Sequence, residues 1–149
     1  GRASSYQNDF KGYNCRLDEL QATFLRIKLK HLDGDNHKRK VIAQYYLDNI
    51  NSTQILLPFC NDLRKHAFHL FVVRCKKRNE LKEYLFKKGI ETLIHYPLPI
   101  HKQLAYKEWN HISFPITEQI HDEVLSLPIS PLLMAKEIKI IVDVLCKFR

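Results

Sequence analysis

The sequence predicts an α+β fold with a small, mostly antiparallel sheet, flanking helices and one long N-terminal helix. Residues 17–32 contain no proline or glycine and carry apolar side chains at helical spacing. Segments rich in β-branched and aromatic residues alternate with polar, helix-like stretches in the middle of the chain. Near the C-terminus, apolar residues recur with the period of one helix face: Met134, Ile138, Ile141, Leu145 and Phe148.

The predicted first helix carries two apolar stripes instead of one. The first stripe includes Leu20 and Phe24, and the second includes Leu25 and Leu29. Because successive residues of a helix are rotated by about 100°, these stripes lie roughly 140° apart. We therefore expect this helix to pack against two different bodies.

The next part of the chain predicts one more helix and then three strands. The Asp-Gly-Asp-Asn run at residues 33–36 is expected to break the first helix, and a second amphipathic helix follows over residues 37–49. Strands are predicted over residues 53–59, 67–74 and 90–96, and the first two are expected to pair.

Capping residues and prolines divide the rest of the chain. A helix is predicted to begin with Asn79 as its N-cap and to end before Gly89, which suits the left-handed position after a helix. After a proline-rich exit, residues 100–115 are predicted to form a loop or short helix that can border a site. A short helix over residues 117–125 and a closing helix to about residue 148 complete the fold.

Composition limits the possible functions. The chain has 149 residues, a formal charge of +8 and 45% apolar residues, which is typical of one folded domain or part of a longer chain. No GxGxxG or GxxxxGK[ST] motif occurs, so we expect no glycine-rich phosphate loop. No apolar run approaches the roughly 20 residues that span a bilayer, and no signal-peptide pattern is present. We therefore expect no membrane partner and a cytoplasmic location.

The residues that bind metals or nucleic acids form no strong pattern. On a predicted strand, His66 and His69 point to opposite faces, and a proline-rich turn separates His95 from His101, so no metal site is predicted. Basic runs such as residues 38–40 are interrupted by acids, which favours a solvated surface; a nucleic-acid-binding module is an alternative. The cysteines lack CxxC spacing and are expected to be free thiols in a reducing compartment: Cys15, Cys60, Cys75 and Cys146.

Two stretches stand out as candidate sites. In GYNCRLDELQA, Asn14 and Arg16 lie at the start of the first helix, where free amides, the helix dipole and a guanidinium favour an anion. The alternative is that Asn14 only caps the helix and Arg16 pairs with a following acid. In IHYPLPIH, His95 and Tyr96 end a strand before a rigid turn, which suits presentation to a ligand. The alternative there is a half-buried strand end.

These stretches belong to a longer series of motifs that covers nearly the whole chain. Together with KLKHL, HAFHLFVVR, GIETLIHYPLPIHKQLAY and LSLPISP, they resemble the C-terminal part of sugar aminotransferases of the DegT/DnrJ/EryC1/StrS family. The SYQN loop is similar to the subgroup that acts on nucleotide-linked 3-keto-6-deoxyhexoses. The resemblance implies a pyridoxal phosphate enzyme of fold type I, a homodimer with active sites at the subunit interface. Residues 1–16 would be a loop entering the interdomain helix, and residues 17–149 the C-terminal small domain.

The resemblance also implies residue roles. An amino acid, usually glutamate, would give its amino group through the cofactor to a nucleotide-linked keto sugar, as in cell-surface polysaccharide or lipopolysaccharide biosynthesis. Asn14 and Arg16 would bind the cofactor phosphate. The family's Schiff-base lysine lies upstream, so no residue of this chain is predicted to be catalytic and the chain alone is expected to be inactive. A non-catalytic interaction domain derived from this fold is an alternative. The implied substrate contacts are His95, Tyr96, His101 and Tyr6.

Overall fold

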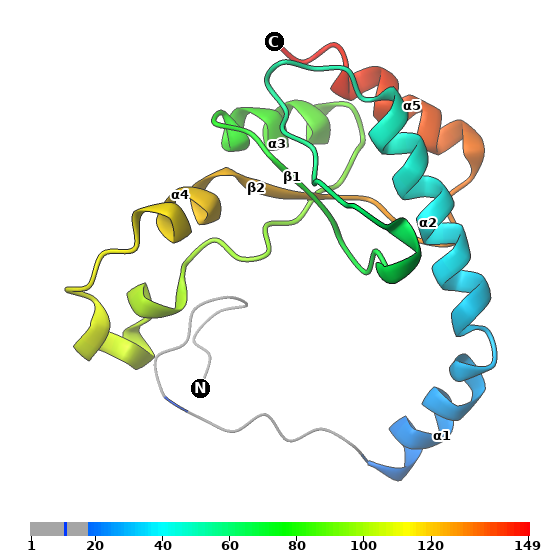
Figure 1. The fold of residues 1–149 in the computed structure, drawn as a ribbon, viewed down its shortest axis with the longest axis horizontal. Coiled ribbons are helices and arrows are strands. Elements are labelled where there is room, and N and C mark those ends of the chain that lie inside the picture. The colour runs from blue at the N-terminus through cyan, green and yellow to red at the C-terminus, as the bar shows by residue number, and fades with distance from the viewer. Residues whose placement is uncertain (1–10, 12–17) are drawn as a thin grey trace.

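The computed structural model describes residue 11 and residues 18–149, and it confirms the α+β architecture (Figure 1). In chain order, the helices and strands are α1 (Glu19–Leu29), α2 (Leu32–Asn49), β1 (Phe71–Arg74), α3 (Arg78–Lys87), α4 (Pro115–Glu123), β2 (Val124–Leu127) and α5 (Ala135–Leu145). Three short 3-10 helices lie between them: η1 (Leu63–Lys65), η2 (Ile100–Lys102) and η3 (Leu104–Trp109). η2, η3 and α4 form an arm that extends away from α2 and α5 (Figure 1).

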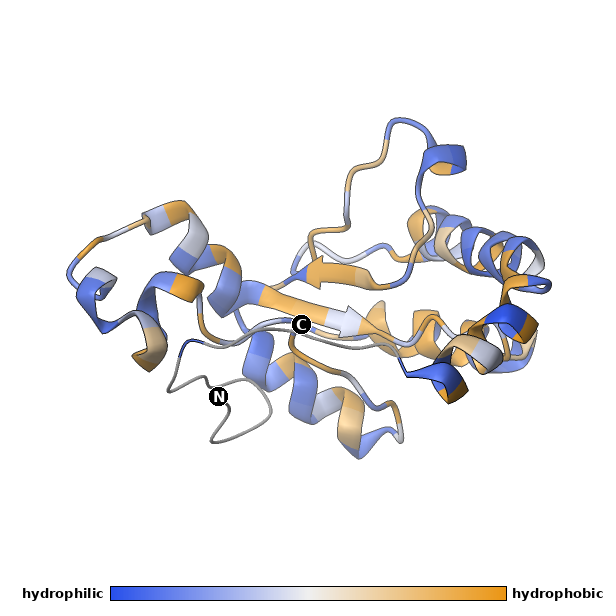
Figure 2. Cartoon of the chain, turned by 90° about the horizontal axis from the view of Figure 1, so that it is seen from below, coloured by the Kyte–Doolittle hydropathy of each residue, from blue (hydrophilic) through white to orange (hydrophobic). Residues whose placement is uncertain are grey.

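The sheet consists of β1 and β2, which are antiparallel, as expected for most of it. Phe71 lies opposite Leu127, and Val73 lies opposite Leu125. All four side chains are buried, because alternate residues of a strand face the same side and this side faces the helices. Figure 2 shows apolar residues concentrated along these strands.

Two predicted strands are wrong in extent. Residues 53–59 and 90–96 each contribute one isolated bridge to the sheet, through Leu56 and Leu93 respectively. Pro58 lacks the amide hydrogen that the next pair after Leu56 would need, so the pairing of residues 53–59 stops after one bridge. The predicted strand at 67–74 is shortened to β1.

β2 was not predicted, and the short helix expected over residues 117–125 is observed as α4, which ends at Glu123. All four residues of β2 are buried. A short buried run of apolar residues fits a strand or a helix equally well, so periodicity alone did not separate them. The start of β1 also moved, because Phe68 adopts a left-handed φ of 47° that ends any extended run before it.

α2, α3 and α5 enclose the core together with the sheet. Tyr46 from α2, Leu85 from α3 and Leu145 from α5 are all fully buried. The stripe predicted for the closing helix is confirmed at Ile141, Leu145 and Phe148, but Met134 is exposed because it precedes the first turn of α5. The second half of α5 and the residues directly after it therefore contribute to the core.

The break between the first two helices lies earlier than predicted. α1 ends at Leu29 and α2 begins at Leu32, so the Asp-Gly-Asp-Asn run is helical. Asp33 and Asp35 lie in the first turn of α2, where the positive end of the helix dipole stabilises carboxylates. No residue of α1 is buried, and it extends away from the body of the fold (Figure 1).

The boundaries of α3 are partly as predicted. Its N-cap is Lys77 and not Asn79, which lies inside the first turn. Gly89 has a φ of 77°, which confirms its left-handed position after the helix. Cys60, Cys75 and Cys146 are free thiols, while Cys15 lies outside the described residues. Within residues 18–149, no helix is both long and apolar enough to cross a membrane.

Candidate functional site

The bridge between Leu93 and Ser126 places His95 against the middle of β2. The Ser126 amide donates to the Leu93 carbonyl at 2.8 Å, and the Leu93 amide donates back at 3.3 Å. Two residues further along, the Nδ1 of His95 is hydrogen-bonded to the Ser126 hydroxyl at 2.9 Å. Ser126 is only 5% exposed, whereas His95 is half-buried. The sheet therefore holds one edge of the imidazole and leaves part of the ring accessible.

Tyr96 lies beside His95 at the end of this segment. The two rings are edge to face, with centroids 5.6 Å apart. The Tyr96 side chain is 54% exposed, and its carbonyl accepts a hydrogen bond from Nδ1 of His121 on α4. The structure thus brings the predicted pair together and keeps Tyr96 open to solvent.

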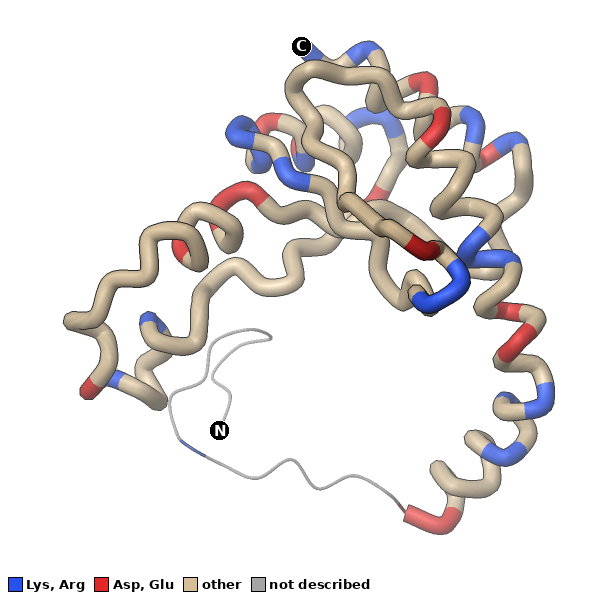
Figure 3. The backbone as a smooth tube through the Cα atoms, viewed as in Figure 1, with Lys and Arg blue, Asp and Glu red and all other residues tan. Residues whose placement is uncertain are grey.

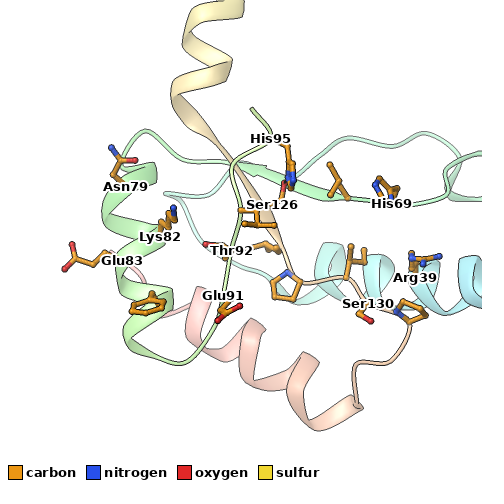
Figure 4. Close-up of a pocket in the computed structure, with 17 residues that line it drawn as sticks. Arg39, His69, Asn79, Lys82, Glu83, Glu91, Thr92, His95, Ser126 and Ser130 are labelled. Carbon is orange, nitrogen blue, oxygen red and sulfur yellow. The ribbon is translucent and has the colours of Figure 1, made fainter. Parts of the chain in front are cut away.

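A cavity of about 900 Å³ lies next to His95. Its lining comes from α3, from the segment around residues 91–95 and from the chain that leaves β2 (Figure 4). The Thr92 hydroxyl in this lining is buried and has no hydrogen-bond partner among the described residues. Arg39 and His69 border the opposite side (Figure 4). The cavity combines apolar walls with a few polar groups, as ligand sites usually do.

His101 occupies a different environment from His95. It is only 6% exposed, and its Nε2 is hydrogen-bonded to Oε1 of Glu118 at 2.9 Å. Its ring lies edge-on to Phe114, and it does not line the cavity. Hydrogen bonds from the Phe114 amide and then from His101 lower the pKa of Glu118. His101 therefore ties η2 to α4, a role that the sequence did not indicate.

Lys102 strengthens the same junction. Its ammonium donates to the carbonyl oxygens of Asn110 at 3.0 Å and Ile112 at 3.1 Å. It also lies 3.7 Å from the Glu118 carboxylate. These contacts join η2 to the rest of the arm that follows the Pro-x-Pro turn.

The other predicted site residues, Asn14, Arg16 and Tyr6, lie outside the described residues. At the start of α1, the Asp18 carboxylate accepts a hydrogen bond from the Gln21 amide at 2.7 Å. This is an ordinary N-cap bond.

Ser126 is the site residue that sequence reasoning missed. It belongs to LSLPISP, which contributed to the family resemblance, but that motif carried no functional assignment of its own. Only the register of the Leu93 bridge brings its hydroxyl to His95.

Among the residues that the structure describes, charge and metal-ligand patterns indicate no second site. Lys and Arg are spread over several elements and are mixed with Asp and Glu (Figure 3). The part of the chain that the structure describes holds no cluster of three or more His, Cys, Asp or Glu side chains suited to a metal ion.

Comparison with known proteins gives consistent matches. The model of the DegT/DnrJ/EryC1/StrS aminotransferase family matches residues 1–146. Over 148 residues the chain is 52% identical to the dTDP-3-amino-3,6-dideoxy-alpha-D-galactopyranose transaminase of Aneurinibacillus thermoaerophilus, covering 99% of this chain and 41% of that protein. It is 42% identical over 134 residues to the dTDP-3-amino-3,4,6-trideoxy-alpha-D-glucose transaminase of Streptomyces venezuelae, covering 88% and 35%.

Solved structures agree with these matches. The S. venezuelae DesV structure in complex with a ketimine intermediate has a TM-score of 0.82 and 39% identity, and the match covers 99% of this chain and 40% of that one. The Bacillus subtilis ntda structure with bound cofactor PMP has a TM-score of 0.76 and 28% identity, covering 90% and 33%. The chain thus spans about 40% of the length of the first of these relatives.

Proposed function

Because the chain belongs to the DegT/DnrJ/EryC1/StrS aminotransferase family, we propose that it is the C-terminal small domain of a pyridoxal-phosphate-dependent sugar aminotransferase. The full enzyme would move an amino group from an amino acid, with glutamate as the expected donor, to a nucleotide-linked keto sugar. The observation that carries this proposal is 52% identity over 148 residues to a transaminase named for a dTDP-linked amino sugar. We expect a dTDP-linked 3-keto-6-deoxyhexose as substrate and a role in deoxysugar or cell-surface polysaccharide synthesis.

Lys102 does not fit the role of covalent cofactor anchor. It lies in η2 of the arm and is half-buried, and its ammonium is bonded to two carbonyl oxygens, an arrangement that suits a structural cation. When bound, pyridoxal phosphate stores the amino group between the two halves of the reaction. We assign its phosphate to Asn14 and Arg16, because they precede α1 in the sequence and anions are favoured near a helix N-terminus. The lysine is expected in the upstream part that the relatives possess.

His95 and Tyr96 are proposed to bind and orient the keto sugar. An imidazole and a phenol can both hydrogen-bond sugar hydroxyl or carbonyl oxygens. His95 borders the cavity, and Tyr96 continues from it with an exposed ring. His101 is expected to act through its bond to Glu118, by holding the arm in place, and not by direct contact.

We propose that the active form is a homodimer in a reducing, cytoplasmic setting, which is consistent with the three free thiols among the described residues. The alternative is a non-catalytic interaction domain of the same fold. The two proposals differ in whether the region that precedes this chain in the full-length protein contains the Schiff-base lysine. A full-length protein without an upstream Schiff-base lysine would favour that alternative.

The test uses the full-length enzyme and measures its two half-reactions separately. His95→Ala should slow amination of a dTDP-linked 3-keto-6-deoxyhexose by about ten- to a hundredfold and leave the glutamate half-reaction nearly unchanged, because only the sugar would contact this side chain. His111→Ala, which removes an exposed histidine, is the control. Equal losses in both half-reactions would make His95 structural. Failure of the parent enzyme to aminate any nucleotide-linked keto sugar would refute the proposed function.

The cofactor assignment has its own test. Asn14→Ala in the full-length enzyme should increase cofactor dissociation far more than it lowers the melting temperature of the cofactor-free protein. Equal cofactor affinity in variant and parent would contradict a phosphate-binding role for Asn14.

A further inference from the structure

We propose that η3 holds the Lys11 side chain in a receptor made of Tyr106 and Glu108. Through this contact, η3 positions the segment that carries Asn14 and Arg16, so Lys11 is a positioning residue for the cofactor phosphate. The inference rests on the proposed function, in which Asn14 and Arg16 bind that phosphate. It gives a purpose to η3, which belongs to the arm and to the region that the sequence predicts to border a site (Figure 1).

Two groups of η3 contact the same ammonium. The Lys11 Nζ donates a hydrogen bond to Oε1 of Glu108 and forms an ion pair with this carboxylate. The same nitrogen lies over the ring of Tyr106, 5.2 Å from the ring centroid. An aromatic ring attracts a cation through its negative face, so the ring and the carboxylate act together. Lys11 and Glu108 are 97 residues apart in sequence, so the contact joins distant parts of the chain.

The receptor is tied to neighbouring parts of the arm. The Tyr106 ring stacks on Trp109, with centroids 4.8 Å apart and planes inclined by 17°. The Asn110 side chain, directly after η3, donates to the His101 carbonyl at 2.7 Å. The Lys102 ammonium donates to the Asn110 carbonyl at 3.0 Å. Two hydrogen bonds therefore connect the end of η3 to η2.

The segment with the phosphate-binding candidates lies in sequence between two residues that make defined contacts. Lys11 precedes it, and Asp18 follows it as the N-cap of α1, where the Asp18 carboxylate accepts the Gln21 amide at 2.7 Å. Residues 12–17 connect the two. Because three residues span at most about 11 Å, a held Lys11 also limits how far Asn14 can lie from η3.

Holding this segment raises cofactor affinity through preorganisation. A free segment must be ordered when the phosphate binds, and the entropy lost is subtracted from the binding free energy. The Lys11 contact orders part of the segment beforehand. The contact is exposed, since the Lys11 and Glu108 side chains are 58% and 48% accessible, so it is worth no more than a surface ion pair and one ring contact. We therefore expect a two- to fivefold effect, roughly, on cofactor affinity.

Zero-length cross-linking of the full-length enzyme tests the contact itself. A carbodiimide joins a carboxylate to an amine that touches it, through an amide bond. Mass spectrometry should find Lys11 joined to Glu108. The Lys87–Glu83 pair of α3 is the internal control, because it is also exposed and in direct contact. Cross-linking of the control pair without the product between Lys11 and Glu108 would overturn the proposal.

Cofactor affinity of the full-length enzyme tests the consequence. Pyridoxamine phosphate is the probe, because its amine forms no Schiff base with a lysine and its affinity reports non-covalent contacts alone. Lys11→Glu and Glu108→Lys should each raise its dissociation constant by about two- to fivefold. The double variant should recover most of the loss, because it restores the ion pair with the charges exchanged. Glu80→Lys reverses an exposed acid of α3 that pairs with Lys77, and it should have no effect.

A further pair of variants tests the ring. Tyr106→Phe keeps an aromatic face below the ammonium and should bind pyridoxamine phosphate as the parent does. Tyr106→Leu removes that face and should weaken binding by about two- to fivefold. The melting temperature of the cofactor-free enzyme should change little in the charge variants, because exposed ion pairs add little to stability. Affinity losses that the charge exchange does not recover would overturn the proposal.

Asn14→Ala separates this proposal from the proposed function. If Asn14→Ala weakens cofactor binding but the charge variants do not, Lys11 is not a positioning residue and the phosphate role of Asn14 stands. If Asn14→Ala leaves cofactor affinity unchanged, the phosphate role of Asn14 is refuted, and with it the purpose assigned to the Lys11 contact.

Discussion

Replacing Tyr46 with phenylalanine isolates one buried hydrogen bond at the centre of the fold. The Tyr46 side chain is fully buried, and its hydroxyl donates to the Pro128 carbonyl at 2.8 Å. Its ring lies edge-on to Phe71 with centroids 5.1 Å apart, and phenylalanine keeps this contact. The bond ties α2 to the chain directly after β2, so its loss should be felt in the global stability of the domain.

The expected cost at neutral pH follows from the geometry. A short, buried, neutral hydrogen bond contributes about 0.5 to 1.5 kcal/mol, and the upper half of that range applies because the Tyr46 donor is fully shielded. Pro128 is half-buried, so water can partly replace the lost donor. We therefore expect Tyr46→Phe to lower the free energy of unfolding by about 1 to 1.5 kcal/mol.

Alkaline pH should remove the difference in stability between the parent and the Tyr46→Phe variant. Burial raises the pKa of the Tyr46 phenol above its ordinary value, so the folded chain keeps the proton after the unfolded chain has released it. Stability from this group is complete below about pH 10 and falls as the pH rises further. At pH 11 the loss is about 1.4 kcal/mol. Because phenylalanine has no proton to lose, the unfolding curves of parent and variant should converge near pH 11.

Urea denaturation of the 149-residue chain, repeated from pH 7 to pH 11, measures both effects. Tyr84→Phe is the matched control, since the Tyr84 hydroxyl donates to the Val144 carbonyl at a longer 3.3 Å and its ring is only half-buried. Its cost at pH 7 should be clearly smaller. Two results would refute this expectation: a Tyr46→Phe variant as stable as the parent at pH 7, or a difference in free energy of unfolding between parent and variant that stays constant to pH 11.

Three other expectations follow from the fold. Gly89→Ala should destabilise the chain by about 1 kcal/mol, because the φ of 77° at this position strains any residue with a Cβ. Gly34→Ala, inside α2, should instead stabilise the chain by about 0.5 to 1 kcal/mol. Urea midpoints of the two variants that move in the same direction would contradict these expectations. The hydrogen bond from the Phe114 amide is the main cause of the lowered pKa of Glu118, so the ionised carboxylate stabilises the folded arm above about pH 4.3, and this stabilisation is lost as the pH falls further. Protease sensitivity of the arm should therefore rise below about pH 4, and it should rise less in Glu118→Gln. The isolated chain should show no transaminase activity and should self-associate through the exposed apolar side chains of α1. Phe24→Lys should lower the molecular mass measured by sedimentation, and an unchanged mass would exclude α1 as the contact.

The sequence predicted helices better than strands. The apolar repeat of the closing helix and the glycine after α3 are local signals, and both correspond to observed features. Strand pairing is not a local property. β2 forms because Leu125 and Leu127 lie opposite residues of β1 that are about 50 positions earlier in the chain, and the four residues of β2 alone do not indicate that pairing. The misplaced helix break has a different, local cause: aspartate is common in loops, but it is also favourable in a first helical turn, where Asp33 lies.

The candidate site was predictable where the motif was contiguous. His95 and Tyr96 are adjacent in sequence, and the strand end before two prolines indicated that they would be presented together. The environment of His101 was not readable, because Glu118 is 17 residues away and its approach depends on the folded arm. Ser126 lies 31 residues from His95, so its bond depends on the same long-range register that was missed for β2.

α1 offers the clearest physical argument for how this domain would serve a larger enzyme. Phe24 and Leu25 lie on the two apolar stripes, yet they are 63% and 56% exposed. Such a helix is costly to leave in water, and about 60% of the length of the A. thermoaerophilus transaminase and of the S. venezuelae structure lies outside the region that this chain matches. We expect that upstream region to cover one stripe of α1. Packing there would fix the start of α1, and with it Asn14 and Arg16, relative to the sheet that carries His95. The cofactor phosphate and the sugar would then be held at a set distance by a single helix and a single strand pairing.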